Sequence, residues 1–403
     1  MSEAGRIGVW IVGARGSVAL CTLAGAAALR AGLIEPTGMV SELEAFRPLR
    51  LADPGRFVFG GHEIRPGDLV TAAARFHRRT GVLHPDILRR VRAALRRADA
   101  RIRPGFTLDR AAGAPKVAAG VHVGRGVSPR ALVDRVRRDL RAFQGAERLE
   151  RVIVVHLATT EGVASERVSR LDWRGFERRL AGRTAAGFTA SLLYGWAALS
   201  ERMPFINFTP SPGAEHPALA ELAAAQGVPV AGNDGKTGET LVKTVLAPMF
   251  LCRNLKLRTW FGYNLLGNDD GAALADPRRC ASKLKTKDAA LTRMVQDPEL
   301  RSKVTIDFAP SLDDWKTAWD FIHFEGFLGT RMSLQFCWQA SDSALAAPLV
   351  LDLVRFTERS ARLGESGPLT HLGSFFKAPL GVSEPDFHRQ FARLLAYAGA
   401  GGA

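Results

Sequence analysis

The chain has 403 residues, a formal net charge of +15, 46% hydrophobic residues and 24% charged residues. This composition is typical of a globular protein that is long enough for two domains or one large one. No apolar run reaches the roughly 18 residues of a membrane span, and the first residues lack the pattern of a signal peptide. The 4 cysteines are scattered and form no CxxC motif, so we expect free thiols in a reducing cytoplasm.

The positive charge raises the question of nucleic-acid binding. The densest basic stretch runs from Arg75 to Arg103, where aliphatic residues recur among the arginines with the spacing of an amphipathic helix. Aromatic residues are not interleaved in this stretch, and the chain has no zinc-finger or RNP motif. We therefore expect neither nucleic acid nor a membrane as a partner. A basic fold that binds anionic small molecules is the better interpretation.

The first element in chain order is a short buried strand at Ile7–Val12, followed by a Gly13–Val18 loop and a helix of small residues that ends near Arg30. Glycines in the loop permit a tight turn and a close approach of the backbone to a ligand. The free N–H groups at the start of the helix can bind a pyrophosphate. The spacing is GxxG and not the full GxGxxG, which alone is a weak signal. Its place after an N-terminal strand predicts the opening of a dinucleotide-binding domain.

Three more buried strands follow at Arg151–Leu157, Pro204–Phe208 and Val228–Ala231, and each ends in a loop of small polar residues. Helical patterns lie between them at Phe188–Arg202 and Pro217–Gln226. Alternation of strand, small-residue loop and helix predicts a parallel, doubly wound α/β sheet. Ligands of such sheets bind at the loops that follow the strands.

After these strands the pattern changes. Segments such as Leu257–Tyr263 and Met332–Trp338 alternate like antiparallel strands, and Ala344–Arg362 has the pattern of a long helix. We therefore expect an α+β domain inserted into the dinucleotide-binding domain. The expected division is a Rossmann-type NAD-binding domain of residues 1–240, completed by residues 345–403, and a catalytic and oligomerisation domain of residues 241–344.

Lysine is rare in this chain: the 55 basic residues include only ten lysines, and nine of these lie between Lys236 and Lys377. A lysine can lose its proton when it is desolvated, whereas an arginine in practice cannot. The retained lysines are therefore candidates for phosphate binding or proton transfer. Lys283 and Lys287, four residues apart, would share one face of a helix, as a phosphate clamp or a proton-transfer pair. The alternative is a solvated, charged turn.

A glycine-rich loop at Gly232–Thr240 precedes a helical pattern and can form a nest of N–H groups for a phosphate, with Lys236 adding charge. The alternative is an ordinary turn with a helix cap. Asn268, Asp269 and Asp270 form an acidic turn that could hold a metal or orient a lysine. The chain has no HExxH or EF-hand pattern, and its histidines do not cluster at ligand spacing, so the sequence leaves the metal unknown.

Several stretches together resemble the myo-inositol-1-phosphate synthase family, and in particular its shorter archaeal-type branch. The stretches are VWIVGARGSV, VSELEAF, FGGHEIR, INFTPSPG, AGNDGKTGETLVKT, YNLLGNDDG, SKLKTK, HFEGFLG and FFKAPL. The resemblance covers the chain from Gly8 to about Pro379. It implies a Rossmann-type domain built from both ends of the chain and a central catalytic domain that forms a homotetramer.

The resemblance also implies a reaction. Glucose 6-phosphate is oxidised at C5 by NAD, loses a proton from C6, closes by an intramolecular aldol step and is reduced again, so that 1L-myo-inositol 1-phosphate forms without net redox change. Three other functions stay open: a synthase that makes a different cyclitol phosphate from another sugar phosphate, an NAD-dependent sugar-phosphate dehydrogenase, and a catalytically silent NAD-binding protein. The last is disfavoured because the family's reactive residues are present.

The resemblance further implies roles for individual residues. The expected catalytic residues are Lys283, Lys287, Lys316, Lys377, Asp234, Asp270 and Asp342. The expected NAD-binding residues are Gly13, Ala14, Arg15, Gly16, Ser17, Val18, Glu42, Thr159 and Asp234. The expected ligands of the substrate phosphate are Lys236, Thr237, Gly238 and Glu239.

Two positions depart from the family pattern. Glu239 stands where the longer branch has a glutamine, and a carboxylate beside a phosphate favours a bridging cation, divalent or monovalent. Asn268 stands where some archaeal-type members have an acid, which weakens the case for their divalent-metal site.

Overall fold

The computed structural model describes residues 5–109, 117–268, 271–272 and 291–400. The larger of its two main sheets has seven strands in the order β13-β8-β7-β6-β1-β2-β3, and every neighbouring pair is parallel. The strands are β1 (Ile7–Val12), β2 (Phe57–Glu63), β3 (Ile102–Pro104), β6 (Arg151–His156), β7 (Phe205–Asn207), β8 (Pro229–Ala231) and β13 (Gly367–Pro368). The order reverses between β1 and β6, as in dinucleotide-binding sheets.

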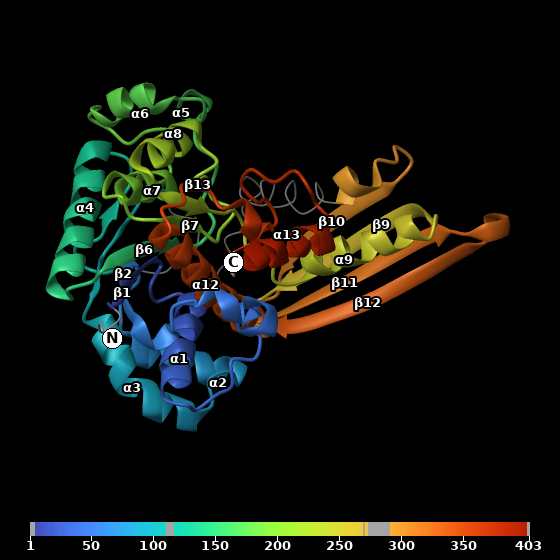
Figure 1. The fold of residues 1–403 in the computed structure, drawn as a ribbon, viewed down its shortest axis with the longest axis horizontal. Coiled ribbons are helices and arrows are strands. Elements are labelled where there is room, and N and C mark those ends of the chain that lie inside the picture. The colour runs from blue at the N-terminus through green and yellow to red at the C-terminus, as the bar shows by residue number, and fades with distance from the viewer. Residues whose placement is uncertain (1–4, 110–116, 269–270, 273–290, 401–403) are drawn as a thin grey trace.

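Helices cover both faces of this sheet (Figure 1). One layer contains α1 (Ser17–Arg30), α2 (Leu69–Thr80), α3 (Pro85–Asp99), α12 (Asp342–Arg362) and α13 (Phe387–Ala400). The other contains α4 (Pro129–Ala146), α6 (Trp173–Leu180), α7 (Ala190–Ser200) and α8 (Pro217–Gln226). Successive residues of β1 face opposite layers, because side chains alternate along a strand. Ile7, Val9 and Ile11 pack under α1 and α12, whereas Trp10 and Val12 pack under α4 and α7.

The expected doubly wound α/β fold is confirmed. The helix predicted after the glycine loop ends at Arg30, and those predicted at 188–202 and 217–226 are α7 and α8. The basic stretch forms α3 and part of α2, with Val91 and Leu95 facing the core and most of the arginines facing solvent. Three smaller elements complete this part of the fold: the helix α5 (Glu166–Ser169) and a two-strand pair, β4 (Phe106–Thr107) and β5 (His122–Val123).

The second sheet is mixed and extends away from the first (Figure 1). Its order is β10-β9-β11-β12, with β9 (Lys256–Leu266), β10 (Arg301–Phe308), β11 (Trp315–Glu325) and β12 (Arg331–Ser341). β9 and β12 both pair antiparallel with β11, as their alternation predicted, but β10 runs parallel to β9. The helix α9 (Glu239–Cys252) covers one face, where Ala247 and Phe250 pack on Trp260 and Ile322.

The opposite face of the second sheet carries partly exposed aromatic residues. The rings of Tyr263, Trp319 and Phe321 follow one another across β9 and β11, with centroids 5.6 and 6.5 Å apart. Tyr263 and Trp319 keep 38% and 39% of their surface exposed. At the turn between β11 and β12, Phe327 and Leu328 are almost fully exposed. The second sheet thus exposes aromatic residues on this face and two large apolar side chains at its far turn.

The chain passes between the two sheets through helices. The expected domain boundary at residue 240 falls in the first turn of α9, and that at residue 344 falls in the first turn of α12. Both helices pack on the Rossmann part and on the second sheet, and no linker separates the two parts at residue 240 or 344. The division into two domains therefore stays a prediction. Within the described residues no helix combines the length and the apolar character needed to cross a membrane.

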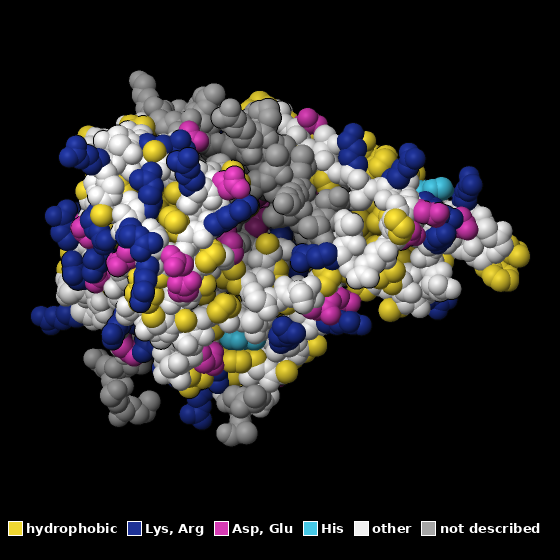
Figure 2. All heavy atoms as spheres, turned by 90° about the horizontal axis from the view of Figure 1, so that it is seen from above, with side chains coloured by type: hydrophobic (Ala, Val, Ile, Leu, Met, Phe, Trp, Pro, Cys, Tyr) yellow, Lys and Arg dark blue, Asp and Glu magenta, His cyan; other side chains and the backbone are white. Residues whose placement is uncertain are grey.

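Positive and negative side chains are both spread over the surface of the Rossmann part. Figure 2 shows Lys and Arg side chains interspersed with Asp and Glu over the Rossmann part of the face in view. Many of the arginines are held in ion pairs, for example Arg101 with Glu147 at 2.6 Å and Arg137 with Glu201 at 2.6 Å. This pattern is that of a solvated surface.

Candidate active site

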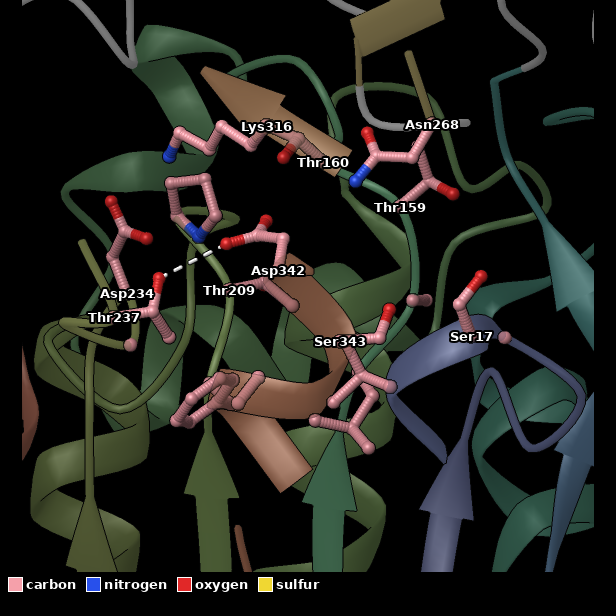
Figure 3. A pocket seen from close by; sticks show the side chains of 18 of the residues that line it. Ser17, Thr159, Thr160, Thr209, Asp234, Thr237, Asn268, Lys316, Asp342 and Ser343 are labelled. Carbon is pink, nitrogen blue, oxygen red and sulfur yellow. Dashed lines mark hydrogen bonds between the residues drawn. The ribbon is translucent and has the colours of Figure 1, made fainter. Parts of the chain in front are cut away.

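A pocket lies where the strand order of the large sheet reverses, beyond the carboxyl ends of β1 and β6. This crevice is the usual ligand site of open α/β sheets. Nine residues expected from the sequence line it: Gly16, Ser17, Val18, Thr159, Asp234, Thr237, Lys316, Asp342 and Lys377. Figure 3 shows Asp234, Thr237, Lys316 and Asp342 around one space, with Ser17 at its side. The structure therefore brings the predicted cofactor loop and much of the predicted catalytic set together.

The glycine loop after β1 has the geometry that a dinucleotide needs. Gly13 has φ of +88°, and a Cβ there would lie 2.9 Å from the Ala158 backbone, so only glycine fits. Gly16 caps α1, and no side chain occupies the first N–H groups of that helix. These N–H groups and the positive end of the helix dipole suit a diphosphate. The residues present thus fit NAD at this position.

A carboxylate at the end of β2 fixes the loop. Glu63 is buried and accepts hydrogen bonds from the backbone N–H groups of Arg15 at 2.6 Å and Arg65 at 3.0 Å. In dinucleotide-binding units the acidic residue near the second strand accepts from the ribose hydroxyls. The sequence analysis assigned the cofactor role to Glu42 instead. Because β2 begins only at Phe57, Glu42 precedes this strand and forms an ion pair with Arg355, away from the glycine loop.

A short antiparallel pairing places Lys377 against Asp234. Lys236 N donates to Phe375 O at 2.8 Å, and Lys377 N donates to Asp234 O at 2.7 Å. Asn233 N donates to Ala378 O at 2.8 Å. The pairing leaves Lys377 Nζ 2.8 Å from Asp234 Oδ1, with both side chains buried. The loop after β8 and the segment between β13 and α13 thus build one ion pair inside the pocket.

A second network fixes Asp342 at the start of α12. Asp314 is buried and accepts hydrogen bonds from the hydroxyls of Ser341 and Ser343, both at 2.5 Å, and from Ser343 N at 3.1 Å. Burial raises the pKa of Asp314, and the hydrogen bonds from Ser341 and Ser343 act in the opposite direction. Thr237 Oγ1 then donates to Asp342 Oδ1 at 3.1 Å (Figure 3). Asp342 is therefore held on both sides before any substrate binds.

Two predicted phosphate ligands point away from this pocket. The Lys236 side chain is buried behind the loop, where its Nζ donates to Gln390 Oε1 at 2.6 Å. Glu239 lies buried beneath α9 with its Oε1 2.7 Å from Lys243 Nζ, and Asp320 is 3.6 Å from the same amine. Thr237 lines the pocket, and Gly238 caps α9 without a side-chain partner. The phosphate role of Lys236 and Glu239 remains a prediction that their placement does not support.

Three predicted catalytic residues, Lys283, Lys287 and Asp270, lie outside the described residues. Their neighbour Asn268 lines the pocket, at the side seen in Figure 3. Of the predicted cofactor residues, Ala14 and Arg15 belong to the glycine loop, but their side chains do not line the pocket. The Arg15 guanidinium instead pairs with Asp99 at 2.9 Å.

The sequence analysis missed several residues of the pocket. Arg65 lies beside Gly16, and Thr160, Phe208, Thr209 and Ser343 line the walls. Most of them directly follow a strand of the large sheet or begin α12. Their position at the end of a strand was therefore the signal in the sequence. The loops at the strand ends were predicted to bind a ligand, but these individual residues were not.

Comparison with known proteins agrees with this geometry. Residues 7–398 match a family model described as myo-inositol-1-phosphate synthase. The chain belongs to this family. It is 33% identical to inositol-3-phosphate synthase 1 of Bacteroides thetaiotaomicron over 397 residues, which span 93% of this chain and 90% of that protein. It is 28% identical to an Arabidopsis thaliana inositol-3-phosphate synthase, isozyme 1, over 85% of this chain and 66% of the plant protein.

Solved structures support the fold. The inositol-3-phosphate synthase of Caenorhabditis elegans aligns with a TM-score of 0.85 and 22% identity, over 100% of this chain and 86% of that one. A myo-inositol-1-phosphate synthase-related protein of Thermotoga maritima aligns with a TM-score of 0.77 and 22% identity, over 98% of both chains. The family, the enzyme class and the NAD-binding domain expected from the sequence are thus confirmed.

Gly13→Ala should weaken NAD binding by about tenfold or more, because the new Cβ meets the Ala158 backbone and displaces the loop. Isothermal titration with NAD measures the effect. The matched control is Gly124→Ala, since Gly124 also has positive φ, at +98°, but nothing lies within 4 Å of its Cβ position. Equal NAD affinity in the Gly13 variant and in the parent would contradict the assignment of the loop.

Proposed function

We propose that the protein converts glucose 6-phosphate to 1L-myo-inositol 1-phosphate, with NAD regenerated in each cycle. The observation that carries the proposal is the pocket in which a dinucleotide loop faces Lys316 and the Lys377–Asp234 pair. Membership of the myo-inositol-1-phosphate synthase family and similarity to inositol-3-phosphate synthases support it. The reaction needs this combination, because its oxidation and its ring closure take place on one bound sugar.

NAD, when bound, supplies a reversible oxidation at C5 of the sugar. The residues of the chain do the remaining work. The N–H groups of Ser17 and Val18 bind the diphosphate at the start of α1, and Glu63 keeps their loop in place. A cofactor held in this way stays with the enzyme until the ketone has been reduced again, so that the sugar leaves without net redox change.

The proton transfers fall to the buried lysines. Removal of the C6 proton creates an enolate, and ring closure creates an alkoxide, so negative charge develops twice on oxygen. Ammonium groups fixed in advance stabilise such charge without reorganisation. Lys377 is fixed by Asp234 at 2.8 Å, and Lys316 enters the same pocket from β11. We propose that these two lysines stabilise the developing charge with Asp342 beside them, and that Lys283, Lys287 and Asp270 also take part in catalysis, as the family resemblance implies.

We propose that the substrate phosphate binds at the start of α9. The Thr237 hydroxyl faces the pocket, and Gly238 leaves the first N–H groups of the 14-residue helix without a side-chain cap. Backbone N–H groups at a helix start are effective phosphate donors. Lys236 has no part in this arrangement, since its amine lies behind the loop.

The described residues give little support to a bridging cation at the phosphate. Such a cation would balance the negative charge of Glu239, but Lys243 already compensates that charge, with its Nζ 2.7 Å from Glu239 Oε1. Among the described residues no three His, Cys, Asp or Glu side chains gather at a common point.

We also propose assignment to the shorter branch of the family and a cytoplasmic location. The similar length of the Bacteroides relative supports the first of these.

Two other functions compete with this proposal. A synthase of a different cyclitol phosphate would use the same lysines on another sugar phosphate. A sugar-phosphate dehydrogenase would need the cofactor loop but not a set of buried cations around the sugar. Lys316, Lys377 and Asp342 in one pocket favour the synthases over the dehydrogenase.

The proposal predicts a specific product. The protein incubated with glucose 6-phosphate and a small amount of NAD should yield inositol phosphate in many-fold excess over the cofactor, identified by phosphorus and proton NMR. Absorbance at 340 nm should stay constant, since NAD is regenerated. A rise at 340 nm in proportion to sugar consumed would establish the dehydrogenase. A different product from another sugar phosphate, with glucose 6-phosphate unreactive, would establish the other cyclitol synthase.

Lys377→Met should lower turnover of glucose 6-phosphate by about 10²–10³-fold, the usual loss when one preorganised donor to a developing oxyanion is removed. NAD affinity should change much less than turnover, since the helix start proposed for the diphosphate belongs to α1 and not to the segment that carries Lys377. Steady-state kinetics and NAD titration measure the two effects. The control is Lys256→Met, an exposed lysine on β9 that pairs with Glu299 at the surface. Parent-like turnover in a folded Lys377 variant would reject the role.

We propose that the aromatic face of the second sheet forms the contact through which the protein assembles as a homotetramer. Tyr263 and Trp319 are exposed there, and their rings and that of Phe321 lie side by side. Phe327 and Leu328 add exposed apolar side chains at the turn of β11 and β12.

Trp319→Glu should shift the protein to smaller species, because a charge would be buried at the centre of the contact. Light scattering coupled to size exclusion measures the mass in solution. The matched control, Leu363→Glu, places the same charge at a position 54% exposed at the end of α12, away from the second sheet. An unchanged mass in the Trp319 variant means that subunits meet elsewhere.

A further inference from the structure

A second cavity, of about 330 Å³, lies behind the loop that carries Asp234 and Thr237. Its walls come from α9, from the first turns of α12, from the segment before Phe376 and from α13. Leu241, Leu345, Leu349, Phe387 and Phe391 make most of these walls apolar. A cavity of this size is within the range of small-ligand sites.

Lys236 is the single charged residue among the described residues that line this cavity. Its side chain is 97% buried, because only 3% of its surface is exposed. Gln390 accepts one of its three N–H groups at 2.6 Å, and the ring of Phe387 lies 5.7 Å from the amine. Within the described residues Lys236 has no carboxylate partner at ion-pair distance. A buried ammonium in apolar surroundings is costly without a counter-charge.

We propose that this cavity binds a small carboxylic acid anion with a short apolar chain, whose carboxylate pairs with Lys236. The carboxylate would supply the counter-charge that the protein itself does not place there, and two N–H groups of the amine remain for it. The apolar walls would receive the chain. A larger polar anion, such as a sugar phosphate, does not suit these walls, because its hydroxyls would lose water without new partners.

The cavity shares a wall with the active site. Thr237 lines both spaces, and its hydroxyl holds Asp342 at 3.1 Å on the other side. The backbone of Lys236 also belongs to the pairing that sets Lys377 against Asp234. An anion at Lys236 would therefore act on the loop that positions two reactive groups, while leaving the sugar pocket open. We infer that such an anion binds together with substrate and does not compete with it.

The titration of Lys236 predicts how the affinity for the anion depends on pH. Burial, followed by the charge of Lys377, lowers the pKa of Lys236 to about 7, and Asp386 acts in the opposite direction. The remaining lining residues, on α9, α12, α13 and the Thr37–Val40 loop, are uncharged. An anion binds the protonated amine, so its affinity should be highest below pH 7. It should fall as the pH rises above 7, where the free protein holds this lysine neutral.

The test uses the NAD-loaded protein and hexanoate as the probe, with hexanamide as its uncharged counterpart. Calorimetry at pH 6.5 should give hexanoate an affinity at least about tenfold higher than that of hexanamide, the gain expected from one charge-assisted contact. Hexanoate should bind equally with and without saturating glucose 6-phosphate.

Two variants locate the site. Lys236→Met, of similar volume, should remove the preference for hexanoate over hexanamide and its dependence on pH. Leu349→Trp should fill the cavity and abolish binding of both probes, whereas Val163→Trp, at a position 72% exposed, should leave it unchanged. The proposal is overturned if the parent protein does not distinguish hexanoate from hexanamide, or if glucose 6-phosphate displaces the probe. None of these results depends on whether the protein forms inositol phosphate.

Discussion

The backbone pairing between residues 233–236 and 375–378 is the contact on which the candidate site depends. It joins the loop after β8 to a segment about 140 residues further along the chain, and it sets Lys377 Nζ at 2.8 Å from Asp234. Because the pairing is made by main-chain groups, it does not depend on the titration of the side chains that it positions. The ion pair is thus a consequence of the fold, and substrate need not assemble it.

The helix α12 has a comparable role on the other side of the pocket. It begins at Asp342, where the second sheet ends, and continues beneath the large sheet against α1. Near its middle, Asp352 accepts a hydrogen bond from Val40 N at 2.7 Å and also binds Ser41. Burial raises the pKa of Asp352 to about 6. One rigid element therefore fixes a reactive carboxylate, the junction of the two sheets and the loop that follows α1.

Much of this could be predicted from local patterns. Ile7–Val12 followed by glycines and a helix of small residues has few alternatives, so β1, α1 and their loop were found within two residues. The directions of the Lys236 and Glu239 side chains could not be predicted, because they depend on distant partners, Gln390 on α13 and Lys243 with Asp320. Glu42 was assigned to the cofactor from the family resemblance, and the strand β2 at Phe57–Glu63, with two glycines and few β-branched residues, was not predicted.

The order of elements along the chain also has a consequence for synthesis. The part of the large sheet formed by β6 and β8 is covered by α12, which lies near the end of the chain. While the ribosome is still producing the second sheet, α1 can already pack on β1, but β6 and β8 lack the cover of α12, and Ile153 and Ala231 are not yet fully buried. Contacts between such distant segments slow folding and leave apolar surface open to association. The strands β6 and β8 must therefore wait for nearly the whole chain before this side of them is buried.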